Sequence, residues 1–242
     1  MLTRAQLLGQ IMANYRRSIA IAGTHGKTTT TSMCTHILIA AEKDPTVMIG
    51  GTLPLLHAGH RVGRGNTIVM ESCEYYNSFL HFYPTIAVIL NIEPDHLDFF
   101  KNLEDIQASF RKFASLVPAD GHIIANLDDR NTMDALRPLN RELVTFGMGP
   151  DADVYPQNIV SKGAQTEFDV MHKGKLFTHV SLRVPGLHNV KNALAATAAA
   201  ICLGINPVAV QYGLAGFTGA GRRFEFKGKF HGADIYDDYA HH

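Results

Sequence analysis

Short apolar runs alternate with amphipathic stretches through the first part of the chain. The runs are rich in β-branched residues and lie at residues 18–22, 67–70, 85–90, 122–125 and 143–146. Successive apolar positions are typical of parallel strands buried on both faces. Apolar residues three or four positions apart predict helices over residues 4–16, 28–41, 103–116 and 131–136. This alternation predicts an α/β fold, a mostly parallel sheet with helices on both faces.

The pattern changes near residue 153. Apolar and polar residues alternate over residues 153–183, and Lys173-Gly174 interrupts them in the manner of a hairpin turn. This segment predicts a small antiparallel β appendage to the main sheet. Helical patterns follow over 189–203 and from Pro207, and residues 223–236 are strand-like again. We therefore expect three parts: a lead-in helix with its linker (1–17), one central domain (18–223) and the start of a truncated further domain (224–242).

Composition narrows the class of protein. Of the 242 residues 46% are hydrophobic, which fits a folded globular chain, and Lys plus Arg equals Asp plus Glu at 22 each. No overall field then favours nucleic acid or acidic membranes, and no apolar stretch approaches the ~20 residues that span a bilayer. We expect a cytoplasmic protein with no nucleic-acid partner and no membrane insertion.

The cysteines are odd in number and widely spaced, which predicts buried free thiols at Cys34, Cys73 and Cys202.

The first candidate for chemistry is GTHGKTTT, residues 23–30, between a predicted strand and a predicted helix. Small residues allow backbone N–H groups to wrap phosphate oxygens, while the helix directs its positive end toward them. Lys27 can supply charge to the β- and γ-phosphates, and the Thr28 hydroxyl can ligate Mg²⁺. Ile21 replaces the usual first glycine, so the motif is the shorter G-x-x-G-K-T. A tight turn that merely caps a helix is the alternative, but the strand–turn–helix context favours a P-loop-type fold that binds ATP.

Acidic and imidazole side chains follow two other predicted strands. Glu71 comes directly after residues 67–70, and His96 lies between Asp95 and Asp98 just after residues 85–90. Ligands of open α/β sheets collect at the carboxyl ends of strands, where a carboxylate can hold Mg²⁺. The same position predicts a functional role for His96. The alternative for these acids is a solvated loop residue, and it is the stronger interpretation for Glu74.

Two further segments offer polar recognition. In PGLHNVKNALAA, Asn189 and Asn192 share one helix face and follow His188, and amides suit the edge of an adenine. Asn189 could equally be a helix N-cap. In GAGRRFE, residues 219–225, glycines precede two arginines that can bind phosphate or carboxylate oxygens, with a solvated basic turn as the alternative.

Taken together and in this order, these segments resemble the Mur ligases of peptidoglycan synthesis, relatives of folylpolyglutamate synthase. The resemblance covers almost the whole chain, and GTHGKTTTTSM, ESCEYYNSFL and NIEPDHLDFF are most similar to the branch that joins L-alanine to UDP-N-acetylmuramate. Family members form an acyl phosphate from ATP and a substrate carboxylate, which an amine then attacks. The resemblance implies ATP and Mg²⁺ as cofactors and, for the complete enzyme, UDP-N-acetylmuramate and L-alanine as partners.

The resemblance also implies roles for single positions. Catalysis would use Lys27, which stabilises the moving γ-phosphoryl group, together with Glu71 and His96. Thr28 and Glu71 would hold one Mg²⁺, and His96 a second that bridges the acyl phosphate. The positions implied to bind ATP are Gly23, Thr24, His25, Gly26, Lys27, Thr28 and Thr29 for the phosphates, His188, Asn189 and Asn192 for the adenine, Arg223 for phosphate and Asp237 for the ribose.

On the substrate side, Asn77 and Ser78 match the region that meets the sugar nucleotide, and His25 would lie near its carboxylate. Several members carry a carbamylated lysine that supports the second Mg²⁺. Arg111 and Lys112 lie in the corresponding helix, and the sequence leaves open whether either takes the place of that lysine. The domain that holds UDP and most of the domain that closes over ATP are expected to lie outside these 242 residues.

We therefore expect weak Mg²⁺-ATP binding and little or no ligation by this chain alone. Two alternatives stay open at this point. One is a related ligase for another substrate, a tripeptide-recycling enzyme or a polyglutamate synthase. The other is a nucleotide-binding module without catalysis of its own, since closure of a further domain can be needed to assemble such a site.

Overall fold

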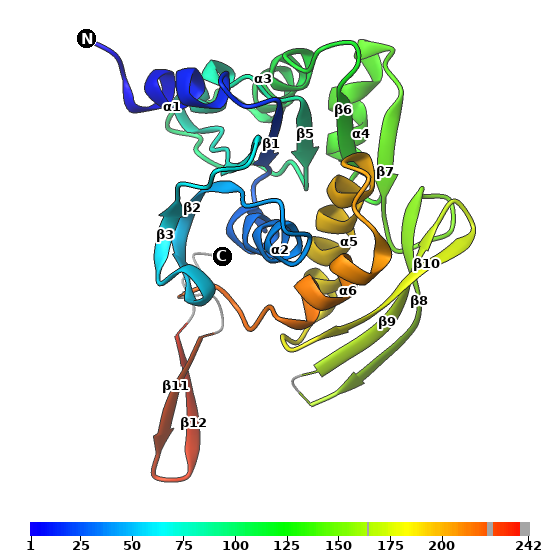
Figure 1. Cartoon of the computed structure of the whole chain (residues 1–242). Coiled ribbons are helices and arrows are strands. Elements are labelled where there is room, and N and C mark those ends of the chain that lie inside the picture. Colours follow the sequence, from blue (N-terminus) through cyan, green and yellow to red (C-terminus); the bar gives the residue numbers. More distant parts are fainter. Residues whose placement is uncertain (164, 222–224, 238–242) are drawn as a thin grey trace.

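The computed structural model describes residues 1–163, 165–221 and 225–237 (Figure 1). Ten strands form one sheet in the order β10-β9-β8-β7-β6-β5-β1-β4-β2-β3. They are β1 (Arg17–Ala22), β2 (Thr46–Leu53), β3 (Ala58–Arg61), β4 (Thr67–Glu71), β5 (Ile86–Ile89), β6 (His122–Asn126), β7 (Leu143–Phe146), β8 (Val154–Lys162), β9 (Gln165–His172) and β10 (Lys175–Leu182). The helices are α1 (Arg4–Met12), α2 (Lys27–Ala40), α3 (Leu103–Ser115), α4 (Arg130–Leu136), α5 (Leu187–Cys202) and α6 (Pro207–Ala215). Single 3₁₀ segments are η1 (Pro54–Leu56), η2 (Tyr75–His81) and η3 (Arg137–Leu139).

The centre of the sheet is parallel. Strand β1 lies between β4 and β5, and the register pairs Ile21 with Glu71 on one side and with Val88 on the other. The loops that follow these three strands therefore emerge side by side at one edge of the sheet. This arrangement confirms the predicted α/β class and brings together three of the segments that carry candidate chemistry.

Helices cover both faces of the sheet (Figure 1). Ile19 and Ile21 of β1 point into one apolar core, which they share with α2, α5 and α6. The alternate residues Ala20 and Ala22 point into a second core formed with α1, α3 and α4. Because each parallel strand is buried twice, its sequence shows continuous rather than alternating hydrophobicity.

The predicted antiparallel appendage, β8 to β10, is part of the same sheet. Phe146 of β7 pairs with Val154 of β8 in the parallel direction, and β9 and β10 then add antiparallel strands at that end. The turn between β9 and β10 is the predicted Lys173-Gly174, where φ is 49° and 77°. Two successive positive φ values match the two-residue hairpin turn that the right-handed twist of strands favours.

Strands β2 and β3 are not predicted by the sequence pattern. Strand β2 carries Gly50 and Gly51 in its middle, and β3 contains Gly59 and no large apolar residue. Glycine is depleted in strands and has no side chain to produce the alternating pattern. Strand β2 forms because Val47 and Met48 pair with Val69 and Met70 of β4, a contact between distant segments.

The two ends of the chain differ. Helix α1 begins with a capping box between Thr3 and Gln6 and buries Met12 in the second core. At the other end, β11 (Glu225–Phe230) and β12 (Ala233–Asp237) form a separate two-stranded ribbon that extends away from the main sheet in Figure 1. The division into residues 1–17, 18–223 and 224–242 stays a prediction.

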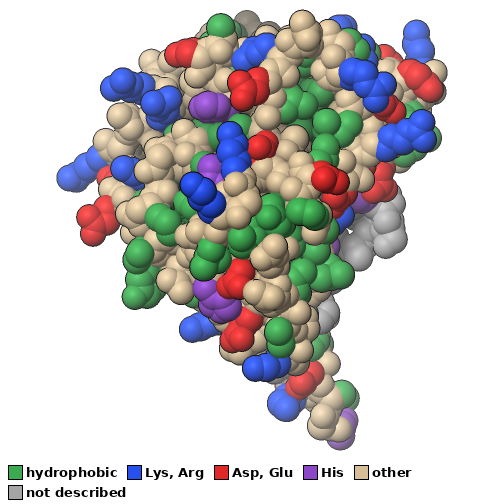
Figure 2. Space-filling model, turned by 90° about the vertical axis from the view of Figure 1, so that its right-hand side faces the viewer, with side chains coloured by type: hydrophobic (Ala, Val, Ile, Leu, Met, Phe, Trp, Pro, Cys, Tyr) green, Lys and Arg blue, Asp and Glu red, His purple; other side chains and the backbone are tan. Residues whose placement is uncertain are grey.

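Charged side chains of both signs mix on one face of the molecule. On the face shown in Figure 2, Lys and Arg lie among Asp and Glu rather than in one patch, in keeping with the equal totals of the sequence. None of the helices in the described part of the chain has the length and apolar character needed to cross a membrane.

The three cysteines are free thiols. Burial raises the pKa of the Cys34 thiol to about 12 and that of the half-buried Cys202 to about 11. The expectation of buried thiols is wrong for Cys73, which is exposed because it lies in the loop after β4 rather than in a helix packed on the sheet.

His36 makes the stability of the fold sensitive to acid. It is buried in α2, edge-on to Phe217, and burial lowers its pKa from 6.5 to about 4. Between these two pH values His36 is protonated in the unfolded chain but neutral in the folded chain. The free energy of unfolding therefore falls as pH drops below 6.5. We expect His36 to account for a loss of roughly 2 kcal/mol in the free energy of unfolding between about pH 7 and pH 4.5. Urea unfolding of wild type and His36→Gln measures this difference.

In that comparison, the variant should show a smaller loss in acid than wild type. His60→Gln, which changes an exposed histidine of β3, is the matched control and should lose as much stability as wild type. Equal losses for wild type and His36→Gln would contradict the assignment.

Candidate nucleotide-binding site

The loop between β1 and α2 is held open in a fixed shape. Gly23 and Gly26 have φ values of 145° and 86°, and Gly26 directly precedes the first residue of α2. Asn91, which follows β5, ties the loop down. Its backbone oxygen accepts from the Thr24 N–H at 3.1 Å, and its amide exchanges hydrogen bonds with the N–H and C=O of His25 at 2.7 and 3.1 Å. The result is a preformed turn at a helix N-terminus, the arrangement that binds anions.

Helix α5 closes on this loop from the other side. The Thr30 hydroxyl donates to Oδ1 of Asn192 at 3.2 Å, although the two residues are 162 positions apart. A Cβ at Gly26 would lie 2.5 Å from the same oxygen, in a backbone conformation that already disfavours side chains. Gly26 therefore serves both the turn and the close approach of α5.

Lys27 does not point freely into the site. Its Nζ donates to the carbonyl oxygens of Gly23 and Thr24 at 2.5 and 3.2 Å and lies 3.2 and 3.1 Å from the two carboxylate oxygens of Glu74. The Glu74 side chain is only 3% exposed. The interpretation of Glu74 as a solvated loop acid is thus wrong, because the loop after β4 turns this residue inward against the lysine.

The Thr28 hydroxyl and Glu71 lie together. The hydroxyl donates to Oε1 of Glu71 at 3.1 Å, and Oε2 of Glu71 accepts from the Gly50 N–H at 2.7 Å. A hydroxyl oxygen and a carboxylate at one edge of the sheet are the hard ligands that Mg²⁺ prefers. These residues fit such an ion.

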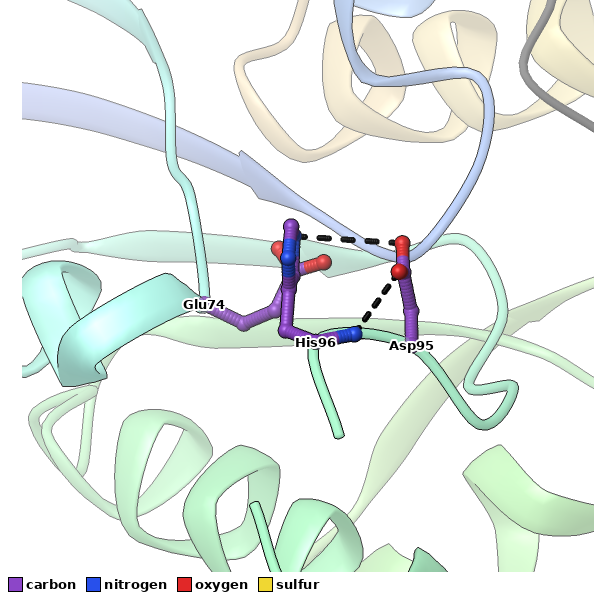
Figure 3. Close-up of side chains that lie close together, drawn as sticks. All are labelled: Glu74, Asp95 and His96. Carbon is purple, nitrogen blue, oxygen red and sulfur yellow. Dashed lines mark hydrogen bonds and ion pairs between the residues drawn. The ribbon is translucent and has the colours of Figure 1, made fainter. Parts of the chain in front are cut away.

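His96 is oriented by its neighbours. Its φ is 51°, its N–H donates to Asp95 at 2.7 Å, and its ring stacks on Tyr75 at 4.3 Å and 20°. The Tyr75 hydroxyl donates to Asp98, and this bond raises the pKa of the Tyr75 phenol. Glu74, Asp95 and His96 offer ligand atoms that all lie within 4.8 Å of one another (Figure 3). Two carboxylates and an imidazole so placed also fit a divalent cation.

Most of the predicted nucleotide-binding residues line one cavity of about 420 Å³. Its walls include the loop between β1 and α2 together with Glu71, Asp95 and His96. The far wall comes from α5 and the segments on either side of α5 and α6. The predicted residues among them are Thr24, His25, Gly26, Lys27, Thr28, Thr29, Glu71, His96, His188, Asn189 and Asn192. A second cavity of about 230 Å³ adjoins it at His25, Gly26, His188 and Asn192 and is also lined by Leu90, Phe146 and Lys191.

The two amides of α5 are already bonded within the protein. Nδ2 of Asn189 donates to the carbonyl oxygen of Pro185 at 2.7 Å, and Asn192 bonds Thr30 and Asn189. The N-cap of α5 is Gly186, so Asn189 is not the cap that the alternative interpretation proposed. His188, by contrast, is exposed at the cavity wall.

Other predicted residues lie apart from the cavity. Oδ1 of Asn77 accepts from Ser109 of α3, and the Ser78 hydroxyl donates to Tyr75 at 2.8 Å; neither side chain lines the cavity walls. Asp237 lies on the β11–β12 ribbon, 3.9 Å from Lys227. Arg223 lies outside the described residues.

The helix in which a carbamylated lysine would be sought is α3. The Nε of Arg111 donates to the carbonyl oxygen of Ala135 in α4 at 2.8 Å, and Lys112 is exposed. Neither residue lines the cavity with His96.

Three residues that organise this site are not assigned a role from the sequence. In the sequence, Asn91 only begins a motif, Asp95 only precedes His96, and Glu74 resembles a solvated loop acid. A signal was available for all three, since each follows a predicted central strand by at most six residues. The sequence pattern does not show whether a side chain in such a loop points into the site or toward solvent.

Comparison with known proteins identifies the class. Residues 21–200 match the model of the Mur ligase middle domain, and the chain belongs to that family. The chain is 50% identical over 243 residues to a UDP-N-acetylmuramate–L-alanine ligase of Agathobacter rectalis, and 48% identical over 240 residues to that of Clostridium novyi. These matches take in 100% and 99% of this chain but 53% and 52% of the relatives, so the chain spans about half their length.

Solved structures agree. The UDP-N-acetylmuramate–alanine ligase of Thermotoga maritima is 31% identical with a TM-score of 0.83, over 96% of this chain and 53% of that one. A UDP-N-acetylmuramate:L-alanyl-gamma-D-glutamyl-meso-diaminopimelate ligase from Neisseria meningitides is 28% identical with a TM-score of 0.81, over 90% of this chain and 71% of that one.

Proposed function

We propose that this chain binds Mg²⁺-ATP and forms the ATP-handling part of a ligase that joins L-alanine to UDP-N-acetylmuramate in the cytoplasm. The observation that carries the proposal is the phosphate loop, whose Lys27 and Thr28 share one cavity with Glu71 and His96. Mur ligases are ATP-dependent, and the two relatives at 50% and 48% identity bear the name of this activity. The solved L-alanine ligase and the solved tripeptide ligase are similarly distant, at 31% and 28% identity, so the choice of L-alanine rests on the 50% and 48% identity of the two relatives.

In the proposed reaction, a carboxylate oxygen of UDP-N-acetylmuramate attacks the γ-phosphorus of ATP. The bond from that phosphorus to the β–γ bridging oxygen breaks, and ADP leaves. The amino nitrogen of L-alanine then attacks the acyl carbon, phosphate departs, and the nitrogen loses a proton. Positioning and charge neutralisation supply most of the catalysis in phosphoryl transfer. The loop N–H groups and Lys27 would provide both.

Magnesium would be held by this chain's own oxygen and nitrogen donors. We assign one ion to Thr28 and Glu71, whose side chains already meet at 3.1 Å, and a second to His96. Bound ions of this kind neutralise phosphate charge and fix the reacting oxygens. The Tyr75 ring stacked on His96 would keep the imidazole in place while the phosphoryl group moves from ATP to the substrate carboxylate.

The remaining assignments follow the family resemblance. His188, Asn189 and Asn192 would bound the adenine, and the existing bonds of the two amides would keep them in a fixed orientation. His25 would lie near the substrate carboxylate, which its position in the cavity wall permits.

Contacts from outside the cavity are proposed on the resemblance alone. Asn77 and Ser78 would meet the sugar nucleotide from the segment after β4. Arg223 and Asp237 would reach the phosphate and the ribose from the end of the chain.

A turnover assay tests the proposal. We expect the 242-residue chain to bind Mg²⁺-ATP weakly and to release little or no phosphate. The same chain extended to the length of its relatives should release phosphate only when UDP-N-acetylmuramate and L-alanine are both present. Phosphate release that ignores L-alanine would contradict the assigned amine. Robust release by the 242 residues alone would contradict the need for further domains.

A further inference from the structure

The ion pair between Lys27 and Glu74 conflicts with the role proposed for Lys27. An ammonium group has three N–H donors. Here two backbone carbonyls and the Glu74 carboxylate accept from Nζ, so the protein itself meets the hydrogen-bonding capacity of the lysine. To stabilise a phosphoryl group, Lys27 must give up part of this set.

The buried carboxylate of Glu74 needs a positively charged partner. Its side chain is 3% exposed and that of Lys27 15%, and a buried carboxylate without a counter-charge is strongly unfavourable. Among the described residues, no other basic side chain forms an ion pair with Glu74. If Lys27 moves toward phosphate, a different cation has to compensate the carboxylate.

The surroundings of Glu74 suit such a cation. Ligand atoms of Asp95 and His96 lie within 4.8 Å of a Glu74 carboxylate oxygen and of each other. Figure 3 shows the three side chains converging from the loops after β4 and β5. His96 is already the residue assigned to the second metal ion, so Glu74 is within reach of the same ion.

We propose that Glu74 exchanges partners when nucleotide binds, giving up Lys27 to the phosphates and binding a divalent cation together with His96. This inference rests on the proposed Mg²⁺-ATP site and adds a residue to it. Glu74 is then a positioning residue that holds Lys27 back in the nucleotide-free protein. Glu74 also couples nucleotide binding to metal binding, because Lys27 can move to the phosphates only when a metal ion takes its place beside Glu74. This coupling is additional to any bridging of the phosphates by metal.

The first test compares nucleotide affinity with and without metal. Wild type, Glu74→Gln and Glu71→Gln are titrated with a fluorescent ATP analogue in Mg²⁺ and again in EDTA. Glutamine keeps the size of Glu74 but has no charge to hold Lys27. We expect Glu74→Gln to bind the metal-free nucleotide about tenfold more tightly than wild type, which corresponds to a change of one decade in Kd. The ratio of the Kd in EDTA to the Kd in Mg²⁺ should therefore be at least tenfold smaller in Glu74→Gln than in wild type.

Glu71→Gln is the matched control for charge. It also removes one negative charge near the end of β4, but Glu71 bonds Thr28 and Gly50 rather than Lys27. It should weaken binding in Mg²⁺ and bring no comparable gain in EDTA. An unchanged or weaker metal-free affinity in Glu74→Gln, or an equal gain in both variants, would overturn the exchange.

The second test uses metal without nucleotide, and it stands even if Glu74→Gln fails to fold. Lys27→Ala leaves Glu74 open to a cation. We expect Lys27→Ala to bind Mn²⁺, followed by electron paramagnetic resonance, about tenfold more tightly than wild type, and to gain more thermal stability from Mn²⁺. The double variant Lys27→Ala/Glu74→Gln should lose both gains. Equal Mn²⁺ affinity and equal stabilisation in wild type and Lys27→Ala would refute the proposal.

The two levels of inference can be told apart. If wild type binds Mg²⁺-nucleotide but neither variant responds as described, the exchange is wrong and the proposed function stands. If wild type binds no Mg²⁺-nucleotide at all, both are wrong.

Discussion

Replacing Lys27 with alanine should lower the affinity for Mg²⁺-ATP by about 100-fold, which corresponds to roughly 2.7 kcal/mol. Lys27 is the only Lys, Arg, Asp or Glu in residues 23–30, and hydrogen bonds to charged groups are each worth about 1.5–3 kcal/mol. Calorimetric titration measures the loss. Lys101→Ala, which removes an exposed lysine from the loop after β5, is the control and should bind like wild type.

The same variant should also be less stable. Without Lys27, the buried carboxylate of Glu74 has no ion-pair partner among the described residues, and broken buried pairs cost about 3–5 kcal/mol. Adding Glu74→Gln removes the buried charge and should restore much of the free energy of unfolding, while nucleotide affinity stays low. A well-folded Lys27→Ala protein that binds Mg²⁺-ATP as wild type does would exclude Lys27 from the phosphate site.

Gly213→Ala should destabilise the fold by about 3 kcal/mol, at the upper end for overpacking. Gly213 lies in α6 where this helix crosses α2, and an added Cβ would lie 2.5 Å from the Cα and 2.7 Å from the N of Ile37. Both atoms are helix backbone, so no side chain can rotate away, and the two helices would have to separate. Urea unfolding measures the change in the free energy of unfolding.

Gly149→Ala is the control for that experiment. Gly149 has no atom within 4 Å of the added Cβ and no positive φ, so its replacement should change stability by less than about 0.5 kcal/mol. A similarly small effect in Gly213→Ala would show that the crossing is looser than the structure has it.

The central strands and the helices could be predicted because each is encoded by the pattern of apolar residues within its own segment. Residues such as Ile19 and Ala20 are apolar in succession because each faces a different layer of helices, and the periodic stripe of α3 needs no partner to be recognised. Strand β2 could not be predicted, since Gly50 and Gly51 break its pattern and its pairing with β4 supplies the stability.

The same division holds for the site. The loop from Gly23 to Lys27 is recognisable because its glycines and lysine are adjacent in sequence. The burial of Glu74 is not, because it depends on a turn after β4 and on a lysine 47 positions away. The contact of Asn192 with Thr30 likewise joins segments whose proximity only the folded sheet creates.

The bonds of Asn91 have a further consequence. One side chain binds both the N–H and the C=O of His25, and the same residue begins the segment that carries Asp95 and His96. The loop between β1 and α2 and the loop that carries Asp95 and His96 are therefore joined at their bases and should move together rather than independently. Little conformational entropy remains for a nucleotide to remove here, so ordering of the loops takes only a small share of the binding free energy.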